Sequence, residues 1–361
     1  MKNLMTAILL SIASLPAAAQ KVDLDKFTFT ANYRVLPREP LDSSYHTYQV
    51  AIKASPTMRP NIREGELAQL VNIPGWKRLT ERAHILVQAR LEDVVIEKTE
   101  LQQRDEVLKD KNGKETGRRT WYFQMITYTF AAQATVVDYK GVLISTIPLA
   151  NRGYKQTYKG AEFSTATEAN IDYKYGQMVT LNLIMRQMVS SALNNLSNIL
   201  SSNYGYLETT VNDYLWILNS RKHPENDKYH QAWLQFKQAM FTMSAEEPLD
   251  NVREMMQPVI SYLNKIKKQY RSTSKTDRKM RYASFYNLAK IYYYLDDPDN
   301  ALAEAAALQV NDFDDKDGRM LEAAATDLKY QLKQSQMHSR HFAIRVEDFT
   351  GPYDMVSSSM Y

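Results

Sequence analysis

The chain has no cysteine among its 361 residues. Disulfides therefore cannot stabilise it, although small exported domains often depend on them because their cores are small. The chain must bury a sizeable apolar core instead, and its length is sufficient for two domains. The absence of cysteine also excludes a lipid anchor attached through a cysteine and catalysis by a thiol nucleophile.

Long apolar runs and a strong charge of one sign are also missing. Beyond residue 19 no stretch approaches the roughly 18 to 20 apolar residues that a membrane helix requires, so we expect no membrane span. The formal net charge is only +4. That charge is too small to indicate a nucleic-acid partner.

The first nineteen residues have the three parts of a cleavable signal peptide. Lys2 gives the positive start, Leu4 to Leu15 gives the apolar core, and Ala17 to Ala19 give the small residues at the cleavage site. A short buried N-terminal helix is the alternative, but no capping residue supports it. We expect an exported protein of the Gram-negative cell envelope, periplasmic or associated with the outer membrane, with the cell surface and the medium as alternatives.

Residues 20–205 are expected to form an α+β domain with a mostly antiparallel sheet. Apolar and polar residues alternate in short runs, which is typical of half-buried strands. Asn112-Gly113 predicts a tight turn at the tip of a long exposed hairpin, and a short helix is expected at Glu64–Val71. The strands are expected at Phe27–Val35, Tyr45–Lys53, Ile85–Leu91, Trp121–Val137 and Val142–Leu149.

The pattern becomes helical near Ser164. Thr165 and Glu168 indicate a helix start, and apolar residues then recur at spacings of three and four up to Leu200. We expect this long helix to end the first domain near residue 205. Residues 206–340 are predicted to form an all-α domain of short antiparallel helices, and residues 341–361 a tail.

The segment from Tyr282 to Leu308 resembles one tetratricopeptide repeat, a helix-turn-helix unit. Phe285 stands at the large aromatic position, Tyr292 at the tyrosine, and Ala301 at the small position of the second helix. A second, partial match runs from Trp216 to Ala239, with the same spacing of sixteen residues between Trp216 and Ala232. A degenerate unit around Asn251–Tyr270 would complete an array of three.

The resemblance implies that the first helix of a repeat lines a concave face that binds a protein partner. In this chain the residues opposite the packing face are Tyr286, Lys290, Tyr293 and Tyr294, and we predict them as partner-binding residues. The alternative is that these side chains are core, because aromatic stripes at helical spacing are more often buried.

No catalytic motif is found, and no cofactor is predicted. Ser190 and Ser191 lie in a helical pattern without a recognisable base. No metal site is predicted either, because His338 and His341 have no further ligands near them. The acidic loop Asp312–Gly318 lacks the acidic first position and the final glutamate of a calcium loop.

The leading functional hypothesis is a non-enzymatic envelope protein that acts in protein interaction or assembly through its helical domain. One alternative is a hydrolase acting on glycans or peptidoglycan, which would need a carboxylate pair in a cleft, from Glu92, Asp93, Glu97 or Asp138. The other is a surface carbohydrate-binding or adhesion module. Clustering of Trp121, Tyr122 and Tyr128 on one exposed face would favour it.

Overall fold

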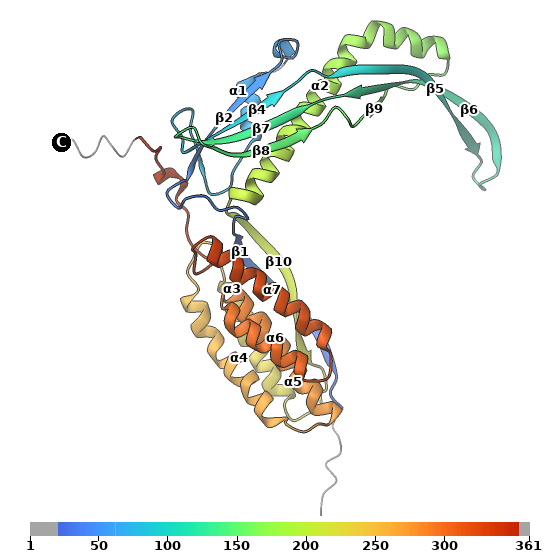
Figure 1. The fold of residues 1–361 in the computed structure, drawn as a ribbon. Helices are drawn as coiled ribbons and strands as arrows, with labels where there is room; N and C mark the ends of the chain where they lie inside the picture. Colours follow the sequence, from blue (N-terminus) through green and yellow to red (C-terminus); the bar gives the residue numbers. More distant parts are fainter. Residues whose placement is uncertain (1–20, 62, 354–361) are drawn as a thin grey trace, which may run out of the picture. The chain divides into compact units, whose positions relative to one another are not determined.

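The computed structural model describes residues 21–61 and 63–353 (Figure 1). The expected signal peptide and the last part of the expected tail, residues 354–361, lie outside the described residues. Three β-sheets and a later run of helices confirm the α+β class expected from the sequence.

Contacts divide the chain into two compact units, which are described separately. We call residues 35–207 with 344–353 the sheet unit, and residues 21–34 with 208–343 the helical unit. The sequence-based division places residues 20–34 in the β domain, whereas their contacts group them with the helices.

Five strands form the larger sheet of the sheet unit, in the order β3-β2-β4-β7-β8. β2 runs parallel to β3 and β4, and the remaining pairs are antiparallel. The parallel pairing follows from the crossover between β2 and β4, which holds three short helical turns in place of a hairpin. The strands are β2 (Thr47–Ala54), β3 (Lys77–Arg78), β4 (Ile85–Leu91), β7 (Ala132–Asp138) and β8 (Leu143–Ala150), and the turns are η1 (Arg59–Asn61), α1 (Glu64–Leu67) and η2 (Ala68–Leu70).

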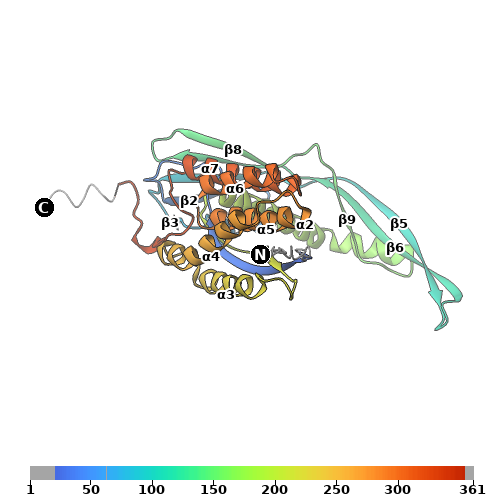
Figure 2. The same cartoon turned by 90° about the horizontal axis from the view of Figure 1, so that it is seen from below.

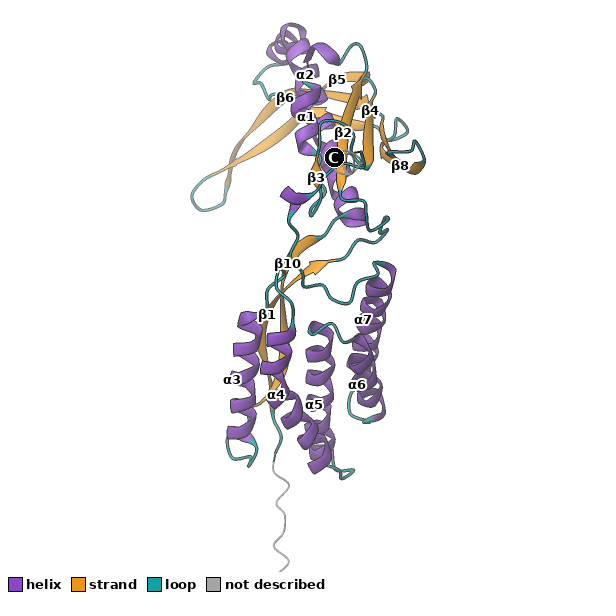
Figure 3. Ribbon diagram, turned by 90° about the vertical axis from the view of Figure 1, so that its left-hand side faces the viewer, coloured by secondary structure: helices purple, strands orange, loops and turns teal. Residues whose placement is uncertain are grey.

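A second sheet consists of β5 (Val95–Lys109), β6 (Glu115–Thr129) and β9 (Gln156–Lys159). The β5–β6 hairpin extends beyond the other strands of its unit (Figure 3). Its tip has the expected turn, since Gly113 has a φ of +80°, which an L side chain rarely adopts. The predicted single strand Trp121–Val137 is wrong: β6 ends at Thr129 and β7 begins at Ala132 in the other sheet.

The long helix α2 (Ala166–Tyr204) packs on both sheets of this unit. Thr165 and Glu168 form the capping box that their spacing predicts: the Thr165 hydroxyl accepts a bond from Glu168 N–H, and the Glu168 carboxylate accepts one from Thr165 N–H. The 3-10 turn η3 (Val346–Asp348) lies in the second segment of the sheet unit, where Lys77 Nζ donates to the carbonyls of Glu347 and Phe349.

The helical unit combines a two-stranded ribbon with five helices. β1 (Leu24–Val35) pairs with β10 (Leu207–Leu218). They run antiparallel, because Asn219 N–H donates to the Asp23 carbonyl at one end and the Thr210 hydroxyl donates to the Asn32 side chain near the other. Helices that are consecutive in the chain pack together, as Figure 2 shows. They are α3 (Asn226–Thr242), α4 (Asp250–Gln269), α5 (Lys275–Tyr294), α6 (Pro298–Val310) and α7 (Asp315–Gln334).

Part of the predicted repeat pattern has to be corrected. The helix-turn-helix expected at Tyr282–Leu308 is present as α5 and α6. Trp216, expected in the first helix of an earlier repeat, lies instead in strand β10. The residues around Asn251–Tyr270 form one helix, α4, and not a helical pair.

Candidate partner-binding site

Helix α5 carries the four residues predicted to bind a partner, and it contacts the ribbon of its own chain. Ser274 begins the helix by accepting a hydrogen bond from Asp277 N–H. From there the spacing of four between Tyr286, Lys290 and Tyr294 places these three side chains on one side of the helix. All three contact β10.

Tyr286 is fully buried and stacks on Tyr214 of β10, with ring centroids 5.6 Å apart and an angle of 22° between the ring planes. Burial raises the pKa of the Tyr286 phenol, and the neighbouring Tyr214 raises it further. The phenol is therefore held neutral, and it acts as a large contact surface.

Lys290 and Tyr294 share one carboxylate of β10, that of Asp213. Lys290 Nζ forms an ion pair with both carboxylate oxygens of Asp213, and Tyr294 Oη donates to one of them at 2.7 Å. The side chains of Lys290 and Asp213 are 12% and 18% exposed. Burial, followed by Asp213, raises the pKa of Tyr294, so its proton stays in place for this bond.

Tyr293 lies at a different part of the face. It is half-buried, and the Arg340 guanidinium sits 4.7 Å from its ring centroid. Arg340 Nη2 also donates to the Tyr293 carbonyl at 2.8 Å. All four predicted residues thus contact segments of this chain, and their binding to another protein stays a prediction.

Asn287, which no sequence motif indicates, takes part in the same contact. Its side-chain oxygen accepts from Trp216 N–H at 2.8 Å, and its amide nitrogen donates to the Trp216 carbonyl at 2.8 Å. The amide therefore bonds both backbone groups of one residue in an extended strand, as a neighbouring strand would. In the sequence Asn287 is only an asparagine next to Tyr286. The local pattern cannot distinguish a buried asparagine from one on the surface of a helix.

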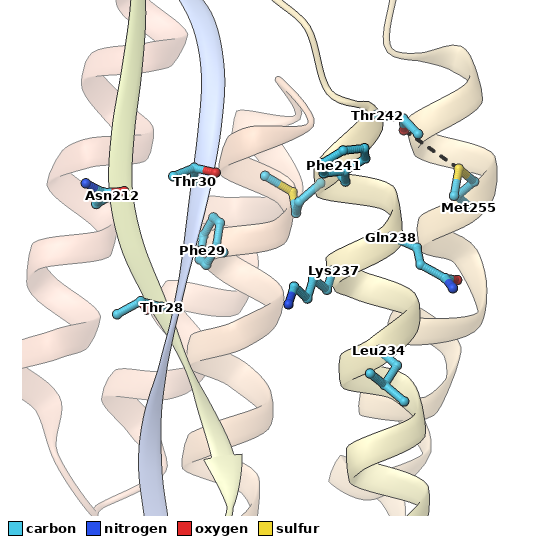
Figure 4. Close-up of a pocket in the computed structure, with 11 residues that line it drawn as sticks. Thr28, Phe29, Thr30, Asn212, Leu234, Lys237, Gln238, Phe241, Thr242 and Met255 are labelled. Atoms are coloured by element: carbon cyan, nitrogen blue, oxygen red, sulfur yellow. Dashed lines mark hydrogen bonds between the residues drawn. The ribbon is translucent and has the colours of Figure 1, made fainter.

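An open apolar groove lies on another side of the ribbon, between β1 and α3 (Figure 4). Its volume is about 670 Å³. Among the residues that line the groove, the two most exposed apolar side chains are Phe241 at 91% and Leu234 at 60%, both on α3. The other lining residues are Thr28, Phe29 and Thr30 of β1, Asn212 of β10, Lys237, Gln238, Met240 and Thr242 of α3, and Met255 of α4.

The free edge of β1, which is the edge opposite β10, lies beside this groove. The Asp23 carbonyl accepts a hydrogen bond from the N–H of Asn219, the residue that follows β10. Arg34 N–H instead donates to the Arg340 carbonyl, on the other edge of β1. Because the direction alternates along an antiparallel strand, the backbone groups of Thr28 and Thr30 point to the same edge as those of Arg34. Among the described strands only β10 pairs with β1, so this stretch has no strand beside it.

The segment Ser339–Phe342 covers the end of that edge. Arg340 accepts from Arg34 N–H at 2.9 Å, and Phe342 N–H donates to the Ala245 carbonyl at 3.0 Å. Its anchor is a buried ion pair, with Arg340 Nε 2.6 Å from Asp296 Oδ1. The edge of β1 is therefore paired at Arg34 and open at Thr28 and Thr30.

The carboxylates considered for hydrolysis all have structural partners. Glu92 pairs with Arg152 and Glu97 with Lys155. Asp93 accepts bonds from the Ser55 and Thr57 hydroxyls, and Asp138 accepts backbone bonds in the turn before β8. Within residues 21–61 and 63–353, no group of three or more His, Cys, Asp or Glu side chains is arranged to hold a metal ion.

The aromatic face considered for carbohydrate binding does not form. Trp121 and Tyr122 are consecutive in β6, so they lie on opposite faces of the sheet, and Tyr128 is buried. No known family model matches the chain, and a search of curated proteins finds no relative. In the part of the chain that the structure describes, no helix has the length and apolar content to cross a membrane.

Proposed function

We propose that this chain is a non-enzymatic, exported envelope protein that binds a partner protein through its helical unit, which is similar to tetratricopeptide repeats. The bound element is an extended segment of the partner, lying along the open edge of β1 in the groove beside α3. The observation that carries the proposal is this combination of an unpaired strand edge at Thr28 and Thr30 with the exposed apolar side chains Leu234 and Phe241.

The helical unit already makes two contacts of this kind with the backbone of its own strands. Asn287 bonds both backbone groups of Trp216, and the backbone of Arg340 pairs with that of Arg34. A partner segment at Thr28 and Thr30 would obtain main-chain hydrogen bonds in the same way and place alternate apolar side chains against α3. The partner segment is therefore expected to be extended and to alternate apolar and polar residues.

The test compares partner capture by three forms of the mature chain. Envelope extract is passed over the immobilised wild-type protein, Phe241→Asp, and Val310→Asp as a matched control, since Val310 is 82% exposed on α6 and does not line the groove. We expect one protein of the extract to be retained by the wild type and by Val310→Asp. The same protein should not be retained by Phe241→Asp.

Hydrogen exchange on the purified complex then identifies the contact. Binding along β1 should slow exchange at the amides of Thr28 and Thr30 by about tenfold or more, because these N–H groups gain acceptors. Capture that is equal in all three forms, or slowed exchange elsewhere with none at β1, argues against the proposed site.

A further inference from the structure

Helix α2 of the sheet unit carries an apolar face that its own unit does not cover. Ile171, Tyr175, Met178, Val179 and Leu183 are spaced by three and four residues, so they lie along one side of the helix. Their exposed fractions run from 50% for Leu183 to 80% for Tyr175. Isolated exposed apolar residues are ordinary, but five adjacent ones on a single helix indicate an interaction surface.

The remainder of α2 shows that this exposure is local. Ile184 and Met185 begin the buried part of the helix, which packs on the sheets, and Val189 is buried among them. The apolar face is thus confined to the N-terminal half of α2. A helix that contacted only solvent there would carry polar residues on that face.

Two exposed charges flank the apolar face and differ in sign. Asp172 lies near its N-terminal end and Arg186 just beyond its C-terminal end. If two copies of this helix pack antiparallel about Val179, Asp172 of each copy lies opposite Arg186 of the other, since both residues are seven positions from Val179. Parallel packing would bring like charges together.

The area is sufficient for a pair of copies. The five side chains expose on the order of 600 Å² on each copy, so pairing them buries about 1,200 Å², at the lower end for stable interfaces. A twofold interface also needs a surface that is complementary to itself, and the antiparallel arrangement provides it. The acidic Asp172 on this face fits an anionic lipid surface less well than a uniformly basic helix would.

We infer that the N-terminal half of α2 is the interface of a twofold symmetric homodimer, in which the helices of two copies pack antiparallel and cross near Val179. This inference is independent of the partner-binding groove, which belongs to the other unit.

The absence of cysteine permits a direct test. Val179→Cys is introduced into the mature chain, which is then oxidised mildly at low micromolar concentration. Because Val179 of both copies lies near the twofold axis, a disulfide-linked dimer should form. Asn194→Cys is the matched control: it is exposed on the same helix but fifteen residues from the axis, so it should not form a disulfide-linked dimer.

Charge reversal tests the orientation in solution. Sedimentation equilibrium should give a dimer dissociation constant about tenfold or more higher for Asp172→Arg and for Arg186→Asp, and restored to within about threefold of the wild-type value in the double variant. A wild-type chain that stays monomeric throughout, equal cross-linking of the two cysteine variants, or a failure of the double variant to recover would overturn the inference. Monomers that bind phosphatidylglycerol vesicles through this face would overturn it as well.

Discussion

The two strands of the ribbon, β10 and β1, make different contacts with the helices around them. Helix α5 contacts β10 in three ways. Asn287 forms hydrogen bonds with the backbone of β10, Lys290 pairs with a carboxylate, and Tyr286 stacks on an aromatic ring. On β1, α3 presents Leu234 and Phe241 to solvent beside unpaired backbone. The helical unit thus contacts its own strand β10 through polar and aromatic groups, and leaves an apolar, open edge at β1, where we propose that a partner binds.

Among the contacts of the helices with β10, the largest effect is expected when Asn287 is changed. Asn287→Ala leaves Trp216 N–H, the Trp216 carbonyl and the Tyr229 hydroxyl without their bonds from this amide. We expect the free energy of unfolding of the helical unit to fall by about 3 kcal/mol, since each buried polar group left unpaired costs about 1 to 3 kcal/mol. Urea unfolding, with hydrogen exchange at the amides of β10, measures the loss.

Asn251→Ala is the control, because Asn251 is exposed in the first turn of α4. Its effect should stay within about 0.5 kcal/mol. Equal losses in the two variants would mean that the hydrogen bonds of the Asn287 side chain to β10 contribute no more to the free energy of unfolding than an exposed asparagine does.

A smaller loss is expected when only the charge contact is broken. Lys290→Met leaves the partly buried Asp213 carboxylate with Tyr294 but without its cation, and we expect a loss of about 2 kcal/mol, less than for a fully buried pair because water still reaches both groups. Adding Asp213→Asn removes the unpaired charge and keeps an acceptor for Tyr294. The double variant should recover about half of the loss in urea unfolding, and no recovery would show that the Lys290 side chain matters through packing alone.

Acid should loosen the segment that closes β1 at Arg34. His341 is buried beside Arg340 and Asp296 and contacts the Ser244 carbonyl, and burial lowers its pKa below the ordinary value of about 6.5. A lowered pKa means that the folded protein favours the neutral ring, so its stabilising contribution is present above about pH 6.5 and is lost as the pH falls through the lowered value.

The measurement is the urea midpoint of the helical unit from pH 7.5 down to pH 5. The midpoint should decline in the wild type and decline less in His341→Asn, whose amide can replace the ring N–H at Ser244. Identical slopes for the two proteins would assign the pH dependence to other groups.

The smallest effect on stability is expected on the open side. Phe241→Ser should change the free energy of unfolding by less than about 0.5 kcal/mol, because the side chain is already in solvent. Phe236→Ser is the matched control in the same helix: Phe236 is buried against Phe29, with ring centroids 5.0 Å apart, and its loss should cost about 3 kcal/mol or more. A large loss for Phe241→Ser would mean that the groove is a structural part of the fold.

Local chemistry explains which elements could be predicted from the sequence. The hairpin turn at Asn112-Gly113 and the start of α2 at Thr165 and Glu168 depend on residues within a few positions of each other. Trp216 could not be placed in the same way. Its strand pairs with β1, nearly two hundred residues earlier in the chain, and its backbone bonds to Asn287 of a later helix.

The candidate site shows the same limit. The spacing of Tyr286, Lys290 and Tyr294 was enough to predict that they share one side of a helix. It could not show that Asp213 and Tyr214 of the same chain would lie against them. The groove beside β1 could not be predicted from local sequence either, because Thr28 and Leu234 come together only through tertiary packing.

The pairing of β1 with β10 also sets an order of events for the new chain. β1 begins at Leu24 and its partner strand begins at Leu207, so β1 is made well before β10. At typical synthesis rates of 5 to 20 residues per second, β1 waits about 10 to 40 seconds for β10. During that interval Phe27 and Phe29 have no core to enter, and contacts so distant in sequence close slowly. A holding chaperone that binds β1 during this interval would therefore protect its apolar side chains from aggregation.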